Sequence, residues 1–150
     1  MSLVFALGAL GCEGQFALLA CGPDVAIAER AIDGDTIVLD GGERVRYLLM
    51  DTPETGECFG TEAALFNRDL VEAREVGLYY DDPCRDRYGR LLAYVEVEGV
   101  NVNRLLVELG YARVLYIPPA GSDRVDEFRA LEQQAKRERR GIWAACSLSR

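Results

Sequence analysis

Two short segments of the chain combine carboxylates with arginines at close spacing. The first begins with the motif DGDT at residues 33–36, continues through Arg46 and ends with DTPE at residues 51–54. The second reads DRYGR at residues 86–90. The sequence contains no histidine, which excludes Ser–His–Asp and Cys–His nucleophile systems and any histidine general base. Chemistry at these segments therefore depends on carboxylates, arginines, tyrosines, cysteines or a metal ion.

Asp35 and Asp51 are the candidate metal ligands. Residues 36–50 predict a β-hairpin, because two strand-like runs flank the turn sequence DGG at residues 40–42. Antiparallel pairing places the start of one arm, at Asp35, beside the end of the other, at Asp51. Two carboxylates at one rim repel each other unless a cation lies between them, and oxygen ligands select Ca²⁺ or Mg²⁺. The alternative is that these aspartates only form turns beside a glycine and a proline.

Three further residues extend this chemistry to a phosphodiester. Glu54 follows Asp51 across a proline that fixes the turn, so it could take a proton from a metal-bound water; otherwise it is a solvated loop glutamate. Arg46 and Arg90 could bind the equatorial phosphate oxygens, where negative charge develops during displacement. Taken singly, each arginine could equally form a surface ion pair.

The elements that must position these residues alternate between strand and helix patterns. We expect strands over residues 25–32, 36–39, 43–50, 78–81, 90–97 and 111–116, and helices over residues 62–75, 103–109 and 123–140. Glycines at 77, 110 and 141 are the expected helix ends. Short strands interspersed with helices suit a small closed barrel with helices packed on it, an α+β architecture.

Composition limits the class of protein. The chain has 150 residues, which favours one domain, and 49% hydrophobic with 28% charged residues is ordinary for a folded protein. The formal net charge of −8 counts against a nucleic-acid binder, because such proteins use Lys and Arg for phosphate affinity. A bound divalent cation would supply positive charge at the site itself.

Cysteines and the N-terminal residues indicate export. None of the five cysteines is in CxxC spacing, which disfavours zinc and fits disulfides in an oxidising compartment. Residues 1–21 are apolar and nearly uncharged, as in an export signal. The run LLAC at residues 18–21 is similar to a lipoprotein cleavage box. We therefore expect Cys21 to carry a lipid that tethers the domain at residues 22–150 to the cell envelope, or, failing that, we expect the domain to be secreted. The alternative is an ordinary buried N-terminal segment.

The motifs DGDT, RYLLMDTPET and DRYGR, in this order and spacing, resemble the staphylococcal nuclease (thermonuclease) family over residues 25–143. The resemblance implies a five-stranded OB-fold β-barrel with three helices and hydrolysis of DNA and RNA, single-stranded by preference, by a monomer. It also implies site roles: Asp35, Asp51 and the Thr52 carbonyl hold Ca²⁺, Arg46 and Arg90 bind the scissile phosphate, Glu54 is the general base, and Arg87, Tyr88 and Tyr116 bind the nucleotide.

Three departures from the family pattern affect substrate affinity and base preference. The loop at residues 56–60 is short where the type enzyme carries a longer, lysine-rich loop. Pro118 replaces a second pocket tyrosine, and the surface is acidic. Two other functions remain open: a catalytically silent OB-fold module that binds nucleic acid or peptide, and an exported calcium-binding protein without nuclease activity. The silent module has no need of the full catalytic set, and the calcium-binding protein leaves both arginines without a role.

The family fold also implies a crosslink. It brings the loop that contains Cys58 and the loop that contains Cys84 toward the same rim of the barrel, which predicts a Cys58–Cys84 disulfide. Cys12 would then leave with the leader, and Cys146 would stay unpaired or reach an unidentified partner. The alternative is that Cys58 and Cys84 are two free buried thiols.

Overall fold

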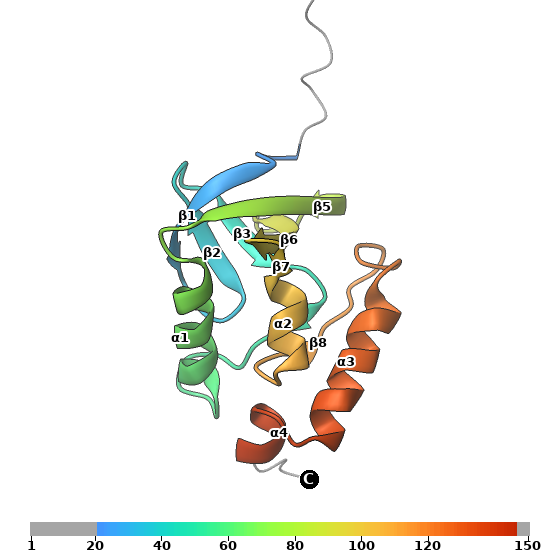
Figure 1. The fold of residues 1–150 in the computed structure, drawn as a ribbon. Helices are drawn as coiled ribbons and strands as arrows, with labels where there is room; N and C mark the ends of the chain where they lie inside the picture. The colour runs from blue at the N-terminus through green and yellow to red at the C-terminus, as the bar shows by residue number, and fades with distance from the viewer. Residues whose placement is uncertain (1–20, 147–150) are drawn as a thin grey trace, which may run out of the picture.

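The computed structural model describes residues 21–146. Figure 1 shows a β-barrel at one end of the molecule and helices at the other. The strands are β1 (Val25–Ala31), β2 (Thr36–Leu39), β3 (Arg44–Tyr47), β4 (Met50–Asp51), β5 (Glu75–Arg85), β6 (Leu91–Val97), β7 (Val100–Asn101) and β8 (Arg113–Val114). The helices are α1 (Gly60–Val71), α2 (Val102–Glu108), α3 (Val125–Arg137) and α4 (Ile142–Ala145).

The barrel closes because β3 has two strand partners. Strands β3, β2, β1, β5 and β6 pair in that order, each antiparallel to the next. Strand β3 also pairs in parallel with β6, through the register Val45↔Leu91, which joins the two ends of the sheet. This arrangement confirms the expected five-stranded OB-fold barrel with helices packed on it.

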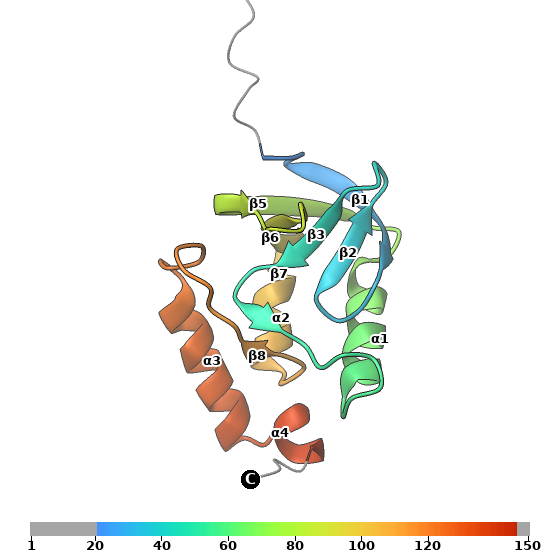
Figure 2. The same cartoon turned by 180° about the vertical axis from the view of Figure 1, so that it is seen from behind.

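Helix α2 packs against β6 of the barrel, and α3 packs against α2 and β8 (Figure 1, and from behind in Figure 2). Helix α3 buries one face along its length, at the four positions that its apolar periodicity predicts: Val125, Phe128, Leu131 and Ala135. Helix α2 is joined to the barrel by Asn103, which is fully buried. The Asn103 side chain accepts a hydrogen bond from Val95 N–H at 2.9 Å and donates to the carbonyls of Leu48 and Ala93 at 3.1 and 3.0 Å.

Several predicted boundaries are wrong. The arm expected over residues 43–50 divides into β3 and β4, because Leu49 adopts a positive φ of 62° and turns the chain. The strand expected over residues 111–116 contains only the two residues of β8. Helix α1 ends at Val71, ahead of the predicted glycine cap at 77, which lies within β5. The last helix ends at Arg137, and Gly141 precedes the four-residue helix α4.

The predicted Cys58–Cys84 disulfide is wrong, and the partner of Cys146, which the sequence left open, is Cys58. Cys58 pairs with Cys146 and Cys84 pairs with Cys21, at Cα–Cα distances of 5.8 and 5.9 Å. The reason is visible in Figure 1: the start of α1 lies at the same end of the molecule as α4, whereas β5 lies at the barrel end. The pairs are 63 and 88 residues apart in sequence, so in the chain-entropy model each lowers the free energy of folding by about 4 to 5 kcal/mol.

The lipid predicted at Cys21 is also incompatible with this structure, because the same sulfur forms the disulfide with Cys84. The predicted export signal at residues 1–21 falls, apart from Cys21, outside the described residues. None of the helices within residues 21–146 combines the length and the apolar composition that a membrane span requires.

We predict that Asn103→Ala lowers the free energy of unfolding by about 2 to 4 kcal/mol, because it leaves buried backbone groups without partners. Urea denaturation with the disulfides intact measures this change. Asn101→Ala is the matched control: Asn101 caps α2 by accepting from Arg104 N–H at 2.8 Å, and losing that cap costs about 1 kcal/mol. Equal losses in the two variants would contradict the role assigned to Asn103.

Candidate functional site

Asp35 is a carboxylate that is only 6% exposed. Thr52 donates to its Oδ2 from both the backbone N–H and the hydroxyl, each at 3.0 Å, and Thr36 donates its hydroxyl to Oδ1 at 3.0 Å. Gly34 permits this approach, because a Cβ at that position would lie 2.6 Å from the Thr52 hydroxyl oxygen. The loop before β2 and the turn after β4 are therefore joined through one buried charge.

Arg46, on β3, lies between Asp35 and Asp51. One guanidinium nitrogen is 2.7 Å from Asp51 Oδ1 and 3.3 Å from Asp35 Oδ2, and the other donates to the carbonyls of Tyr47 and Met50. The two carboxylates that the hairpin pattern predicts to be neighbours thus share one cationic partner. Burial raises the pKa of Asp51, and the opposing charge of Arg46 limits that rise.

A buried pair of polar side chains supports the DGDT loop from behind. The Tyr47 hydroxyl donates to Asn67 Oδ1 at 2.8 Å, and the Asn67 amide donates to the Asp33 carbonyl at 2.8 Å. Burial also raises the pKa of Asp33, to about 6, and the neighbouring Asp35 carboxylate reinforces that rise. Neither Tyr47 nor Asn67 was among the predicted site residues. The polar Asn67 on the inner side of α1 is the sequence signal that could have identified them.

Glu54 lies on an exposed turn that is tightly constructed. Its backbone N–H donates to the Glu57 carboxylate at 2.9 Å, and its carbonyl accepts from Glu57 N–H at 2.9 Å. Gly60 begins α1 directly against this turn, since a Cβ there would lie 1.9 Å from the Glu54 carbonyl oxygen. The Cys58–Cys146 disulfide attaches the same segment to the end of α4. The charge on Glu54 makes a minor contribution to the raised pKa of Asp33.

The DRYGR loop is organised by Asp86. The Asp86 carboxylate accepts from the backbone N–H groups of Tyr88 and Arg90 at 2.9 and 3.0 Å, and from Arg90 Nε at 2.7 Å. Burial opposes ionisation of Asp86, but these hydrogen bonds lower its pKa. Arg87 donates to the Tyr88 hydroxyl at 2.6 Å and lies over its ring, as Arg90 also does. Both arginines and the tyrosine thus form one group.

The DRYGR loop and β3 border one pocket of about 550 Å³. Of the predicted site residues, it is lined by Arg46, Arg87, Tyr88 and Arg90. The carboxylates of Asp35 and Asp51 reach this group through Arg46, which contacts both of them. Apolar side chains, including Leu49, Leu115, Ile117 and Pro118, form much of the remaining lining. A phosphate beside the arginines and a flat apolar group against the rest would both find complementary surface here.

Tyr116 is not part of the pocket lining. Its half-buried ring packs against the hydrophobic core and lies under the Arg129 guanidinium at 5.9 Å. Its neighbours Leu115 and Ile117 line the pocket instead, at 40% and 69% exposure. Alternation along an extended segment explains this difference, because successive side chains point to opposite sides. That alternation is the signal that could have identified Leu115 and Ile117.

Comparisons with known proteins agree with this geometry. A sequence model of the family described as "Staphylococcal nuclease homologue" matches residues 44–145. The chain is 44% identical over 126 residues to "Endonuclease YncB" of Bacillus subtilis (strain 168), covering 77% of this chain and 60% of that protein. It is 43% identical over 126 residues to "SPbeta prophage-derived endonuclease YokF" of the same organism, covering 77% and 43%.

The third relative is "Thermonuclease" of Staphylococcus intermedius, which is 37% identical over 121 residues, covering 75% of this chain and 69% of that protein. The chain spans only 60% and 43% of the lengths of the two Bacillus proteins. The family match includes the barrel strands β3 and β6, the residues around Arg46 and the DRYGR loop. On this sequence similarity and this barrel, the chain belongs to the staphylococcal nuclease family.

Proposed function

We propose that this chain is a calcium-dependent nuclease that hydrolyses phosphodiester bonds of DNA and RNA. The observation that carries the proposal is the position of Arg46, which borders the pocket and also contacts both Asp35 and Asp51. A substrate phosphate in the pocket would meet the same guanidinium that neutralises the two carboxylates. The names of the relatives, two endonucleases and a thermonuclease, support the same activity.

The donor atoms fit calcium. Within the described residues there is no group of three or more His, Cys, Asp or Glu side chains arranged to hold a metal ion. The family resemblance assigns Ca²⁺ to the carboxylates of Asp35 and Asp51 and the Thr52 carbonyl, and water would supply the remaining ligands. All of these are hard oxygen donors, which suit Ca²⁺ better than a softer metal. When bound, the ion supplies positive charge against the carboxylates and the substrate phosphate.

The residues of the chain then divide the reaction among them. Arg46 and Arg90 bind non-bridging oxygens of the phosphate and stabilise the extra negative charge of the transition state. Glu54 accepts a proton from the attacking water, whose oxygen forms the new bond to phosphorus. The P–O ester bond breaks, and the leaving oxygen takes up a proton from solvent. Glu54 suits this role because its turn is exposed to water and is held by Glu57, Gly60 and the Cys58–Cys146 disulfide.

Single-stranded substrates and a monomeric enzyme are parts of the same proposal. Tyr88 is 68% exposed beside Arg87, so an unpaired base could stack on its ring while the arginine meets the backbone. A monomeric enzyme requires that one chain supply all of its site residues, and the arginines, carboxylates and tyrosine proposed here belong to this chain. Export is proposed as well, because two disulfides are typical of an oxidising compartment.

For the base, we predict that Glu54→Gln lowers kcat on single-stranded DNA by a factor on the order of 10², as loss of a general base does. Steady-state cleavage of an oligonucleotide measures this. The control is Glu98→Gln, which alters an exposed glutamate in the turn between β6 and β7. An unchanged kcat in Glu54→Gln would refute the assignment. Binding without cleavage by the wild-type protein would favour the catalytically silent module.

For the metal, we predict one calcium site in calorimetric titration of the wild-type protein and its loss in Asp51→Ala. Removing one of two carboxylates from the ligand set leaves too little negative charge to displace the ion's hydration shell. Asp69→Ala, at an exposed position on α1 that pairs with Arg68, serves as the control. Full nuclease activity in excess EGTA would contradict calcium dependence.

For the compartment, we predict that the protein isolated from the organism that encodes it lacks the predicted export signal that precedes Cys21 and contains both disulfides. Intact mass before and after reduction gives both results, because each disulfide adds about 2 Da on reduction. A cytosolic product that retains Met1 and has free thiols would contradict export.

A further inference from the structure

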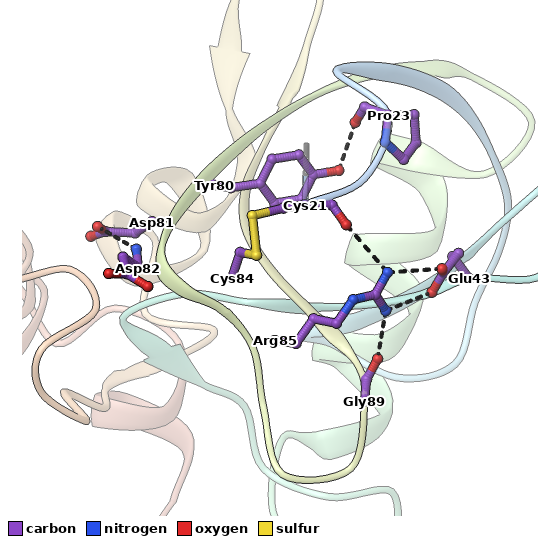
Figure 3. Close-up of a disulfide and its surroundings, with 9 residues drawn as sticks. All are labelled: Cys21, Pro23, Glu43, Tyr80, Asp81, Asp82, Cys84, Arg85 and Gly89. Carbon is purple, nitrogen blue, oxygen red and sulfur yellow. Dashed lines mark hydrogen bonds and ion pairs between the residues drawn. A yellow bond between two sulfur atoms is a disulfide. The ribbon is translucent and has the colours of Figure 1, made fainter. Parts of the chain in front are cut away.

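Arg85 joins three separate segments beside the pocket. Figure 3 shows its guanidinium group between Glu43, Gly89 and Cys21. One terminal nitrogen donates to Glu43 Oε2 at 3.1 Å and to the Gly89 carbonyl at 2.8 Å. The other donates to Glu43 Oε1 at 3.0 Å and to the Cys21 carbonyl at 3.2 Å. The two terminal nitrogens thus make four directed hydrogen bonds.

Those four bonds leave Arg85 little capacity to bind a phosphate. A guanidinium group has five N–H donors, two on each terminal nitrogen and one on Nε. Both donors on each terminal nitrogen of Arg85 have an acceptor within the protein. Arg87, by contrast, uses one terminal nitrogen for the Tyr88 hydroxyl and is exposed. Arg85 borders the pocket, yet its hydrogen bonds are directed into the protein.

The segments that Arg85 joins are those that position the phosphate-binding arginines. Glu43 directly precedes β3, the strand that contains Arg46. Gly89 lies in the DRYGR loop, directly before Arg90. The hydrogen bonds of Asp86 hold this loop together internally. Arg85 ties the loop to the β2–β3 hairpin, because it bonds to Gly89 in the loop and to Glu43 in the hairpin.

The Cys21–Cys84 disulfide anchors the same junction. It bonds Cys84, the residue directly before Arg85, to Cys21, whose backbone carbonyl accepts a hydrogen bond from Arg85 (Figure 3). Tyr80 lies on β5, four residues before Cys84. Its hydroxyl donates to the Pro23 carbonyl at 2.6 Å, which holds the N-terminal segment around Cys21 at a second point. The N-terminal end of the described chain is therefore a fixed support against which Arg85 is held.

We propose that Arg85 is a positioning residue, which sets the distance between Arg46 on β3 and the arginines of the DRYGR loop so that one phosphate can meet both. The inference rests on the proposed nuclease function. It assigns Arg85 no contact with the substrate. The Arg85–Glu43 pair is about two-fifths exposed on both sides, so solvent screening keeps its contribution to global stability small. Its loss should therefore release the loop without unfolding the protein.

The first test measures the loop directly, by hydrogen exchange with mass spectrometry over residues 86–90. Arg85→Ala should speed exchange in this loop and speed tryptic cleavage after Arg87, while the unfolding midpoint stays close to wild type. Arg104→Ala is the matched control, because Arg104 is similarly exposed, at 42%, and it also joins two elements, through ion pairs with Glu108 on α2 and Glu127 on α3. Exchange over 86–90 that is unchanged in Arg85→Ala, or equally faster in Arg104→Ala, would overturn the proposal.

The second test measures kinetics on a single-stranded oligonucleotide. If the loop holds its binding geometry only about a tenth of the time, KM rises about tenfold. Arg85→Lys should not restore KM, because one ammonium group cannot make the four directed bonds. Full restoration by lysine would mean that charge alone suffices, and would overturn the proposal.

Two results separate this inference from the proposed function. If the wild-type protein does not cleave nucleic acid, the nuclease proposal fails and the exchange experiment still decides whether Arg85 holds the loop. If Arg85→Ala does not fold, Glu43→Ala replaces it, because this change removes the carboxylate and leaves Arg85 bonded to two carbonyls only. Faster exchange over 86–90 in Glu43→Ala supports the proposal, and unchanged exchange refutes it.

Discussion

A carboxylate withdrawn from water must be paired and hydrogen-bonded, and Asp35 imposes this requirement on the whole site. Its partners come from three parts of the chain: Thr36 on β2, Arg46 on β3 and Thr52 after β4. Satisfying one buried charge therefore fixes the hairpin and the following turn relative to each other. The same bonds fix Arg46 beside the pocket before any substrate arrives, and such preorganisation is what electrostatic catalysis needs.

Local sequence patterns predicted the parts of the structure that depend on local rules. The hairpin turn, the barrel class and the buried face of α3 follow from spacing within a few residues, and all are confirmed. The disulfide pairing was wrong because it depends on which ends of the molecule the loops occupy. Cys58 lies just before α1 and Cys84 lies within β5, and the start of α1 and the strand β5 are at opposite ends of the molecule. No spacing rule contains that information.

The same division applies to the site. Asp35 and Arg46 are neighbours because the β2–β3 hairpin pairs Thr36 with Arg46, and this was predictable from the turn. Asp51 joins them from β4, after the chain turns at Leu49, and the sequence did not predict that turn. Tyr116 was assigned to the pocket by resemblance alone, and the structure turns its ring toward Arg129. The supporting residues were harder to predict, because Asn67 acts across 34 residues and Arg85 across 42 and 64. A polar residue on the inner side of α1 marks Asn67 in the sequence, whereas Arg85 lies in no recognisable motif. Which groups such residues position becomes visible only when tertiary contacts are known.

The acidic balance of the chain and a phosphate-binding pocket are compatible because they act over different distances. At physiological ionic strength, charges are screened beyond about 8 Å, so acidic side chains elsewhere on the surface have little effect inside the pocket. The net charge of −8 acts mainly by slowing the association of a polyanion with the protein. Under the proposed function, a phosphate in the pocket would meet Arg46, Arg87 and Arg90 at close range. Arg85 adds positive charge at the rim, but Glu43 neutralises it. Affinity would then depend on a few arginines held at fixed separation, which would explain why so much of the structure serves to position them.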